Sequence, residues 1–86
     1  MTPSALNLEW RDLRSKARDA EKKRDFAKAE ALYRQALETI ETTIGPDSVG
    51  VAQILLSLGD CYELEGRAED AKSLYKRARE ILEKLT

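Results

Sequence analysis

The feature that most constrains this chain is an internal repeat with an offset of 42 residues. When the sequence is laid on itself at this offset, seven residues from Glu21 to Glu41 meet identical partners. The matching pairs are Glu21/Glu63, Ala29/Ala71, Leu32/Leu74, Tyr33/Tyr75, Ala36/Ala78, Glu38/Glu80 and Glu41/Glu83. Most of them recur at intervals of three or four, which is the spacing of one helix face, so the two copies are expected to do the same packing job. A chain of 86 residues has room for one small domain made of two such units.

Hydrophobic periodicity predicts four helices and no strands. Apolar residues fall every three or four positions through each predicted helix, and no segment has the alternation with period two that a half-buried strand requires. Thr2 and Pro3 can open the first helix as its N-cap and its first helical residue. Asp25 and Ser48 can cap the second and third helices. Gly66 stands where a left-handed residue is wanted after the third helix.

The boundaries of the two units follow from one strong turn signal, the Gly-Pro-Asp sequence at residues 45–47. We therefore expect a single domain over residues 1–86. The first unit should occupy about residues 3–44, the turn residues 45–47, and the second unit about residues 48–85. The expected fold class is all-α, with two tandem helix-turn-helix units and four helices in antiparallel succession.

Composition excludes several classes of function. Fifteen basic residues balance sixteen acidic ones, so no overall charge points to nucleic acid or to an anionic membrane. The absence of histidine and the presence of one cysteine exclude zinc fingers, disulfide frameworks and histidine-based catalysis. The longest apolar runs are two or three residues, too short for a membrane span. We expect a cytoplasmic, non-enzymatic chain that needs no cofactor and no metal ion, and that binds neither nucleic acid nor membrane.

The third predicted helix has an unusually broad apolar side. Its apolar residues cover an arc of roughly 120° on a helical projection, which suits a helix packed between two neighbours. The residues on this arc are Val51, Ile54, Leu55, Leu58, Cys61 and Tyr62. In the first helix, 42 residues earlier, three of these positions are charged: Asp12, Lys16 and Asp19. A polar outer side is what a capping helix requires, so the sequence predicts that the stack begins with the first helix.

These positions resemble the tetratricopeptide repeat family. In the second unit, seven residues stand at consensus positions with the family's spacing, namely Leu55, Leu58, Gly59, Tyr62, Ala71, Tyr75 and Ala78. The first unit fits at Ala17, Ala20, Ala29, Tyr33 and Ala36. It departs from the consensus at Lys16, where the family has an apolar residue, and at Arg24, where it has a turn glycine.

The period of 42 residues and the segments 45–48 and 71–78 are similar to the kinesin light chain type of this repeat. Leu56 and Ser57 stand where that type often has paired asparagines facing its groove. The resemblance implies a short right-handed superhelical stack that acts as an adaptor or scaffold. Such a stack would bind segments of other proteins without catalysis.

The first helices of the two units are expected to line a groove that binds a peptide or helix of a partner protein. The candidate residues are Arg11, Arg14, Arg18, Lys22, Gln53, Leu56, Ser57, Asp60 and Leu64. Leu56 and Leu64 are either scattered surface leucines or apolar anchors for a bound segment. The three arginines recur every three or four residues, so they form either a ridge of donors for an acidic segment or a solvated helix face.

A second interpretation is a self-assembling structural module. Repeat stacks usually need three or more units for a sufficient core, and this chain has two. An apolar edge at Leu74, Ile81 and Leu85 would then pair with its copy in a symmetric homodimer. Nucleic-acid binding by the first helix is a third, weak interpretation, because the seven basic residues between Glu9 and Arg24 only slightly outnumber the four acidic ones. An enzyme is the least expected function of all. The cysteine, the tryptophan and the three tyrosines are expected in the core.

Overall fold

The computed structural model describes the backbone of residues 3–86 and the side chains of residues 9–86. The helices are α1 (Pro3–Lys22), α2 (Phe26–Thr43), α3 (Val49–Leu64) and α4 (Ala68–Lys84), and residues 3–86 contain no strand. The predicted all-α fold is confirmed. Thr2, expected as an N-cap, lies outside the described residues. None of the helices described is long and apolar enough to cross a membrane.

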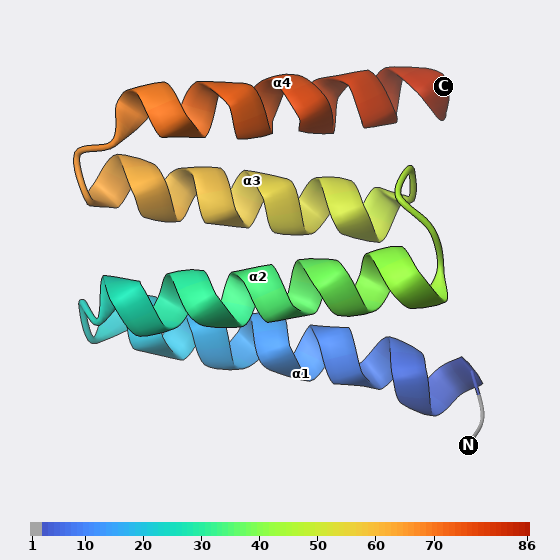
Figure 1. Ribbon diagram of the computed structural model, residues 1–86, viewed down its shortest axis with the longest axis horizontal. Coiled ribbons are helices and arrows are strands. Elements are labelled where there is room, and N and C mark those ends of the chain that lie inside the picture. The colour runs from blue at the N-terminus through green and yellow to red at the C-terminus, as the bar shows by residue number, and fades with distance from the viewer. Residues whose placement is uncertain (1–2) are drawn as a thin grey trace.

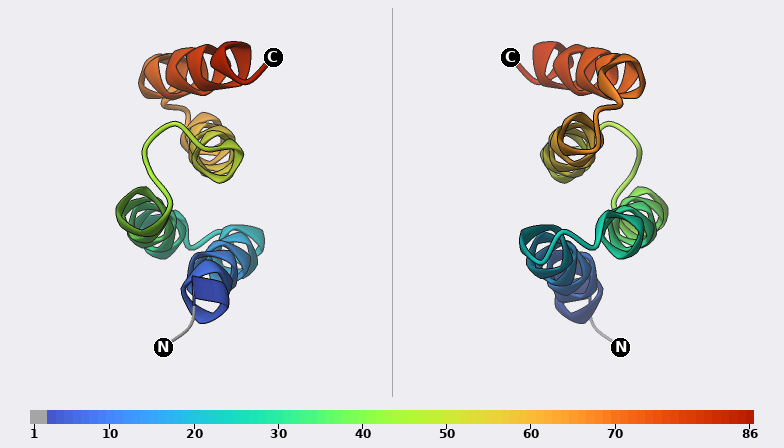
Figure 2. Two further views of the ribbon diagram at one scale, coloured as in Figure 1. Left: turned by 90° about the vertical axis from the view of Figure 1, so that its right-hand side faces the viewer. Right: turned by 90° about the vertical axis from the view of Figure 1, so that its left-hand side faces the viewer.

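The helices pack as two hairpins in chain order. α1 packs against α2, α3 packs against α4, and the hairpins meet where α3 packs against α2. Figure 1 shows the four helices stacked from α1 to α4. Viewed along the helices, α1 and α3 lie to one side of the stack and α2 to the other (Figure 2). The third helix therefore has a neighbour on each side, as its broad apolar arc predicts.

The helix ends follow local capping rules. The side chain of Asp25 accepts a hydrogen bond from the backbone N–H of Lys28 at 3.3 Å, and that of Ser48 accepts one from Val51 at the same distance. Both caps were predicted. Gly66 has the expected left-handed backbone, with a φ of 80°. In the first hairpin the same backbone conformation is taken by Arg24, whose φ is 62°.

The core consists of two clusters, and residues from all four helices contribute to each. One contains Trp10, Ala36, Ile40, Val51, Ala52, Ile54, Leu55, Ala78 and Ile81. The other contains Ala17, Ala20, Ala29, Tyr33, Leu58, Cys61, Tyr62 and Ala71. Eight residues of α3 are buried, more than among the described side chains of α1, α2 or α4, because α3 faces α2 on one side and α4 on the other. Cys61 and Trp10 lie in the core, as expected.

The structure corrects the apolar edge that was predicted on α4. Ile81 is only 2% exposed and belongs to the core, and Leu74 is half-buried against both clusters. Only Leu85, at 51% exposure, is on the surface. Leu74, Ile81 and Leu85 follow one side of α4, but α3 covers that side only at Leu74 and Ile81 and leaves Leu85, the residue after the helix, exposed.

Candidate functional site

The nine residues predicted to line a groove all lie on α1 and α3, the two helices that share one side of the stack (Figure 2). We call this set the α1–α3 surface. Seven of its residues are exposed, namely Arg11, Arg18, Lys22, Gln53, Leu56, Asp60 and Leu64, while Arg14 and Ser57 are half-buried. The fold therefore leaves most of these side chains in contact with solvent.

One side-chain hydrogen bond joins the two helices of this surface. Nη1 of Arg14 on α1 donates to Oε1 of Gln53 on α3 at 3.1 Å. The guanidinium carbons of Arg11 and Arg14 also lie 5.4 and 5.5 Å from the centroid of the Trp10 ring, within range of a cation–π interaction. The buried Trp10 ring thus positions two of the three arginines of the predicted ridge.

The two leucines singled out in the sequence point away from the core, as predicted. Leu56 is 38% exposed and Leu64 is 53% exposed, and both are on α3. They are eight residues apart, a rise of about 12 Å along a helix. Asp60 lies between them in the sequence and is also exposed. This part of the α1–α3 surface therefore combines apolar and acidic groups.

An acidic corner lies beside these leucines. The Tyr75 hydroxyl is 2.6 Å from Oδ1 of Asp60 and is also in hydrogen-bond contact with Glu63. Because a phenol has one proton, it can donate to only one of these carboxylates at a time. Burial raises the pKa of Tyr75, and the hydrogen bonds to both carboxylates raise it further. Among residues 9–86, no lysine or arginine forms an ion pair with either carboxylate.

Glu21 is a half-buried carboxylate near the same corner. Its Oε1 atom is buried and has no hydrogen-bond partner among the described residues. Burial raises the pKa of Glu21 above its usual value, and the negative charge of Asp60 adds to this effect. The neighbouring Tyr33 and Arg18 act in the opposite direction but do not outweigh burial. The charged form of Glu21 is therefore disfavoured in the folded protein.

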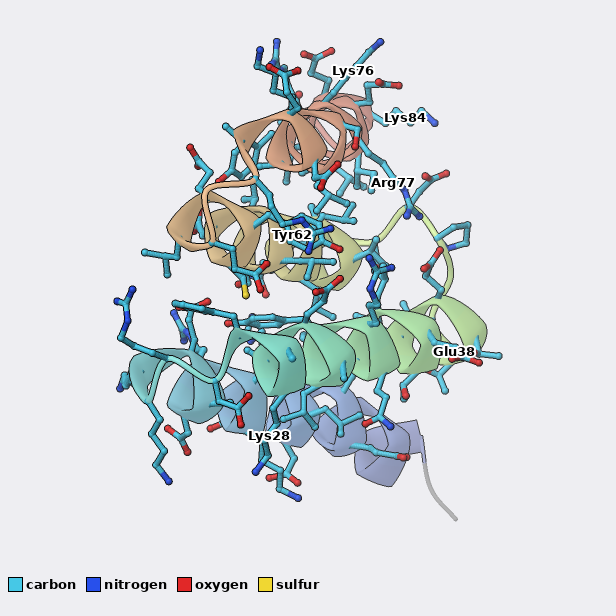
Figure 3. The ribbon with its side chains drawn as sticks, turned by 60° about the vertical axis from the view of Figure 1, so that its left-hand side comes forward. Lys28, Glu38, Tyr62, Lys76, Arg77 and Lys84 are labelled. Carbon is cyan, nitrogen blue, oxygen red and sulfur yellow. The ribbon has the colours of Figure 1, made fainter. Side chains whose placement is uncertain are left out.

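A second polar network, which the sequence did not reveal, ties the two hairpins together. The carboxylate of Glu30 on α2 accepts hydrogen bonds from the Tyr62 hydroxyl at 2.8 Å, from Arg34 at 3.1 Å and from Arg67 at 3.3 Å. Arg67 stacks over the Tyr62 ring, with its guanidinium carbon 4.1 Å from the centroid. Figure 3 labels Tyr62 on α3 within this network. Within this network, the pair Glu30 and Arg34 is four residues apart, a spacing that can be recognised in a sequence as an ion pair on one helix. The other contacts join residues far apart in the chain.

This network changes the acidity of its central group. Burial acts to raise the pKa of Glu30, but the hydrogen bonds from Tyr62 and Arg34, with the charges of Arg34 and Arg67, outweigh burial. The pKa of Glu30 is therefore held below its usual value. The folded protein therefore raises the pKa of Glu21 and lowers that of Glu30.

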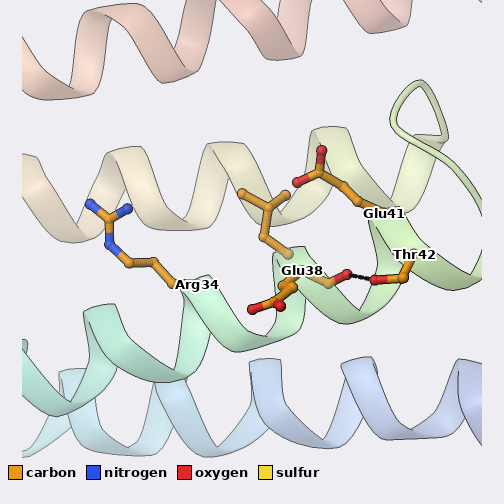
Figure 4. Close-up of a pocket in the computed structure, with 5 residues that line it drawn as sticks. Arg34, Glu38, Glu41 and Thr42 are labelled. Carbon is orange, nitrogen blue, oxygen red and sulfur yellow. Dashed lines mark hydrogen bonds between the residues drawn. The ribbon is translucent and has the colours of Figure 1, made fainter.

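An open cavity of about 520 Å³ lies on α2, away from the α1–α3 surface. Figure 4 shows the residues that line it, which are Arg34, Leu37, Glu38, Glu41 and Thr42. Arg77 extends from α4 toward this region (Figure 3), where its Nη2 donates to Glu41 at 2.9 Å. The cavity has no nucleophile paired with a base. Nor do residues 9–86 include any group of three or more cysteine, aspartate or glutamate side chains that could hold a metal ion.

Comparisons with known proteins agree with the helical-hairpin architecture. None of the curated proteins compared with this sequence is similar to it. The family model of the tetratricopeptide repeat matches residues 13–84, which include most of both hairpins. Repeats of this family generally mediate protein–protein interactions. The chain therefore belongs to the tetratricopeptide repeat family.

Proposed function

We propose that this chain is a non-enzymatic interaction module that binds a segment of a partner protein along the α1–α3 surface. The observation that carries the proposal is the exposure of Leu56 and Leu64, two large apolar side chains on one helix that the domain leaves partly in contact with solvent. Apolar anchors at this spacing suit the apolar side of an amphipathic helix or an extended peptide. Membership of a family whose repeats bind proteins supports the same function.

The basic side chains of α1 define the chemistry of the partner segment. Four basic residues, Arg11, Arg14, Arg18 and Lys22, lie along α1. Trp10 stacks against the first two, so part of the ordering cost of binding is already met in the free protein. The matching segment carries apolar side chains toward α3 and acidic side chains toward α1. Arginine donors bind such carboxylates in a bidentate arrangement.

The test uses labelled synthetic amphipathic peptides, one with glutamates and one with glutamines on the polar side. We expect the glutamate peptide to bind more tightly, and its affinity to fall at raised salt. Leu64→Asp should weaken binding by roughly tenfold or more, because it places a charge where an apolar anchor docks. Leu85→Asp is the matched control, since Leu85 is similarly exposed but follows α4, away from the α1–α3 surface. Equal affinities for the parent and Leu64→Asp would rule out this surface.

The arginines require a separate comparison. Arg18→Ala should weaken binding of the glutamate peptide and reduce its salt dependence. Lys76→Ala removes a cation from α4 and should leave binding unchanged. Binding that does not weaken in Arg18→Ala or in Arg14→Ala would show that the acidic side of the peptide is not recognised. Unfolding curves of each variant confirm that the fold is retained.

A second candidate function is self-assembly through α4. The observation that favours it is the exposure of Leu82, on the last turn of that helix, and of Leu85, directly after it, at 38% and 51%. A symmetric homodimer would cover both leucines in each copy. Sedimentation across a concentration series tests this candidate, because a monomer at every concentration would exclude it.

A further inference from the structure

The two hairpins are buried to different extents at equivalent positions. Tyr33 and Ile40 on α2 are 1% and 0% exposed, because α3 covers them. Their counterparts 42 residues later, Tyr75 and Leu82 on α4, are half-buried and 38% exposed. The same difference holds at three further positions, where Lys72, Arg79 and Glu83 are exposed while Glu30, Leu37 and Glu41 are half-buried. We call Lys72, Tyr75, Arg79, Leu82 and Glu83 the outer face of α4.

α3 covers α2 in part with apolar side chains. Ile54, Leu58 and Cys61, at intervals of four and three residues, are at most 1% exposed. Gly50, at the start of α3, lets the two helices come close, because an added Cβ there would overlap the side chain of Ile40. An apolar stripe with a small residue at its start therefore fits the side of α2 that carries Ile40 and Tyr33.

The cover also has a charged component. Arg67 reaches back to Glu30 at 3.3 Å, and Arg77 reaches back to Glu41 at 2.9 Å. Both arginines belong to the second hairpin, and both glutamates belong to α2. On α4 the glutamate positions hold Lys72 and Glu83. A hairpin that covered α4 in the same way would therefore meet a positive charge at the first position and a negative charge at the second.

We propose that the outer face of α4 docks a helical hairpin of a partner protein. The first helix of that hairpin presents an apolar stripe with the spacing of Ile54, Leu58 and Cys61. The hairpin carries an acidic side chain opposite Lys72 and a basic side chain opposite Glu83. Tyr75 and Leu82 then become buried as Tyr33 and Ile40 are. This surface is on α4, so it is independent of the proposed peptide-binding function of α1 and α3.

A second copy of this chain, stacked head to tail, does not fit the same face. The residues of α1 that would take the places of Ile54, Leu58 and Cys61 are Asp12, Lys16 and Asp19, and all three are exposed. Lys16 pairs with Asp12 at 3.2 Å on the surface. Burying this group against Leu82 would desolvate three charges, and the ion pair would not compensate for that cost. The required apolar stripe must come from a different helix.

The test uses the chain's own hairpins to stand in for the partner. In one fusion, the chain continues after Leu85 with a second copy of residues 44–86, which preserves the 42-residue period and presents an apolar stripe. In the control, it continues after Leu85 with residues 44–47 followed by residues 6–43, which present the polar side of α1. We expect the first fusion to unfold in one transition, with a Tm more than about 5 °C above that of the parent. The control should not raise the Tm, and equal behaviour of the two fusions would overturn the proposal.

Two further variants of the first fusion test the contacts themselves. Leu82→Ser should cancel the rise in Tm. Leu85→Ser should not, because its counterpart Thr43 stays exposed even though α3 is present. Arg67→Glu in the appended copy should raise the Tm further by placing a carboxylate opposite Lys72, whereas the same change in the parent hairpin should lower it by removing a donor from Glu30. If Arg67→Glu changed the Tm in the same direction in both copies, the proposed pairing of an acidic side chain with Lys72 would be contradicted. A parent chain that forms a dimer lost in Leu82→Ser would also overturn the proposal, because a second copy would then occupy this face.

Discussion

Arg24 and Gly66 occupy the same turn position in the two hairpins, and both have a left-handed backbone, with φ values of 62° and 80°. The backbone N–H of each donates to the carbonyl three residues earlier at 2.9 Å, Arg24 to Glu21 and Gly66 to Glu63. A left-handed conformation costs an L-amino acid about 1–2 kcal/mol, and glycine avoids that cost. The Arg24 guanidinium carbon lies 5.2 Å from the centroid of the Phe26 ring, within range of a cation–π interaction. This interaction offsets part of the cost of the left-handed backbone at Arg24.

Replacement of Arg24 by glycine should therefore stabilise the protein. We expect Arg24→Gly to raise the free energy of unfolding by about 1 kcal/mol and the Tm by several degrees. Gly66→Ala should lower the free energy of unfolding by a similar amount. Lys23→Gly is the control, because Lys23 does not have a positive φ and should gain nothing. Thermal and urea unfolding measure all three variants, and an Arg24→Gly variant less stable than the parent would contradict the strain argument.

Two glutamates should give stability opposite dependences on pH. The folded pKa of Glu21 lies above its usual 4.5, so its contribution to stability rises as the pH falls from neutral through that raised value. Glu21→Gln should therefore be more stable than the parent at neutral pH, and this advantage should vanish below pH 4.5. A constant difference across the range would show that charge is not the cause.

The folded pKa of Glu30 is lowered, so its stabilising contribution is present above pH 4.5 and is lost as the pH falls through the folded value. Glu30→Gln should be less stable than the parent at neutral pH by about 1–2 kcal/mol, because charge-assisted hydrogen bonds from three donors are weakened. Urea unfolding at a series of pH values measures this difference. The difference in free energy of unfolding between the parent and Glu30→Gln should become smaller in acid. A difference that became larger in acid would show that Glu30 is not charged in the folded protein at neutral pH.

Cys61 should be unreactive while the protein is folded. Its side chain is fully buried on α3, and burial, together with nearby carboxylates, raises the pKa of the thiol to about 11. Because the thiolate is the reactive form, labelling by a thiol reagent should be at least about 100-fold slower than in the unfolded chain. The rate in denaturant provides the reference. Equal rates with and without denaturant would mean that the site opens readily.

Ile81 and Leu85 should differ strongly when each is replaced by alanine. Ile81 is 2% exposed in the core, so Ile81→Ala should cost about 2–5 kcal/mol of the free energy of unfolding. Leu85 is 51% exposed, and Leu85→Ala should change stability by less than about 0.5 kcal/mol. Urea unfolding separates the two outcomes. Similar costs would contradict the placement of Ile81 in the core and of Leu85 on the surface.

The sequence predicted those features that depend on local spacing. The four helices, the caps at Asp25 and Ser48 and the outward direction of Leu56 and Leu64 all follow from periodicity or from residue type at a turn. The burial of Ile81 was predicted wrongly. A stripe on α4 shows that one side of the helix is apolar, but it does not show how far along that side α3 extends.

The contacts between the hairpins could not be predicted from spacing. Glu30 and Arg67 are 37 residues apart, and many other charged pairs in this chain would have matched equally well. Their contact depends on how closely α3 approaches α2. The left-handed backbone of Arg24 could not be predicted from residue type either, because arginine has no preference for it. The alignment with Gly66 and the turn glycine of the family consensus are the features that mark this position as unusual.

Trp10 is an intrinsic fluorescence probe of the packing between the two hairpins. It is the only tryptophan in the sequence, and it lies in the core cluster in which α1 meets α2 and α3. Its indole ring comes within 3.2 Å of where a Cβ on Gly50 would stand, so it senses the second hairpin as well as the first. Separation of the hairpins would expose the ring to water even if each helix stayed intact. Fluorescence and circular dichroism would then report different events, and their agreement or disagreement during unfolding would measure the cooperativity between the two repeats.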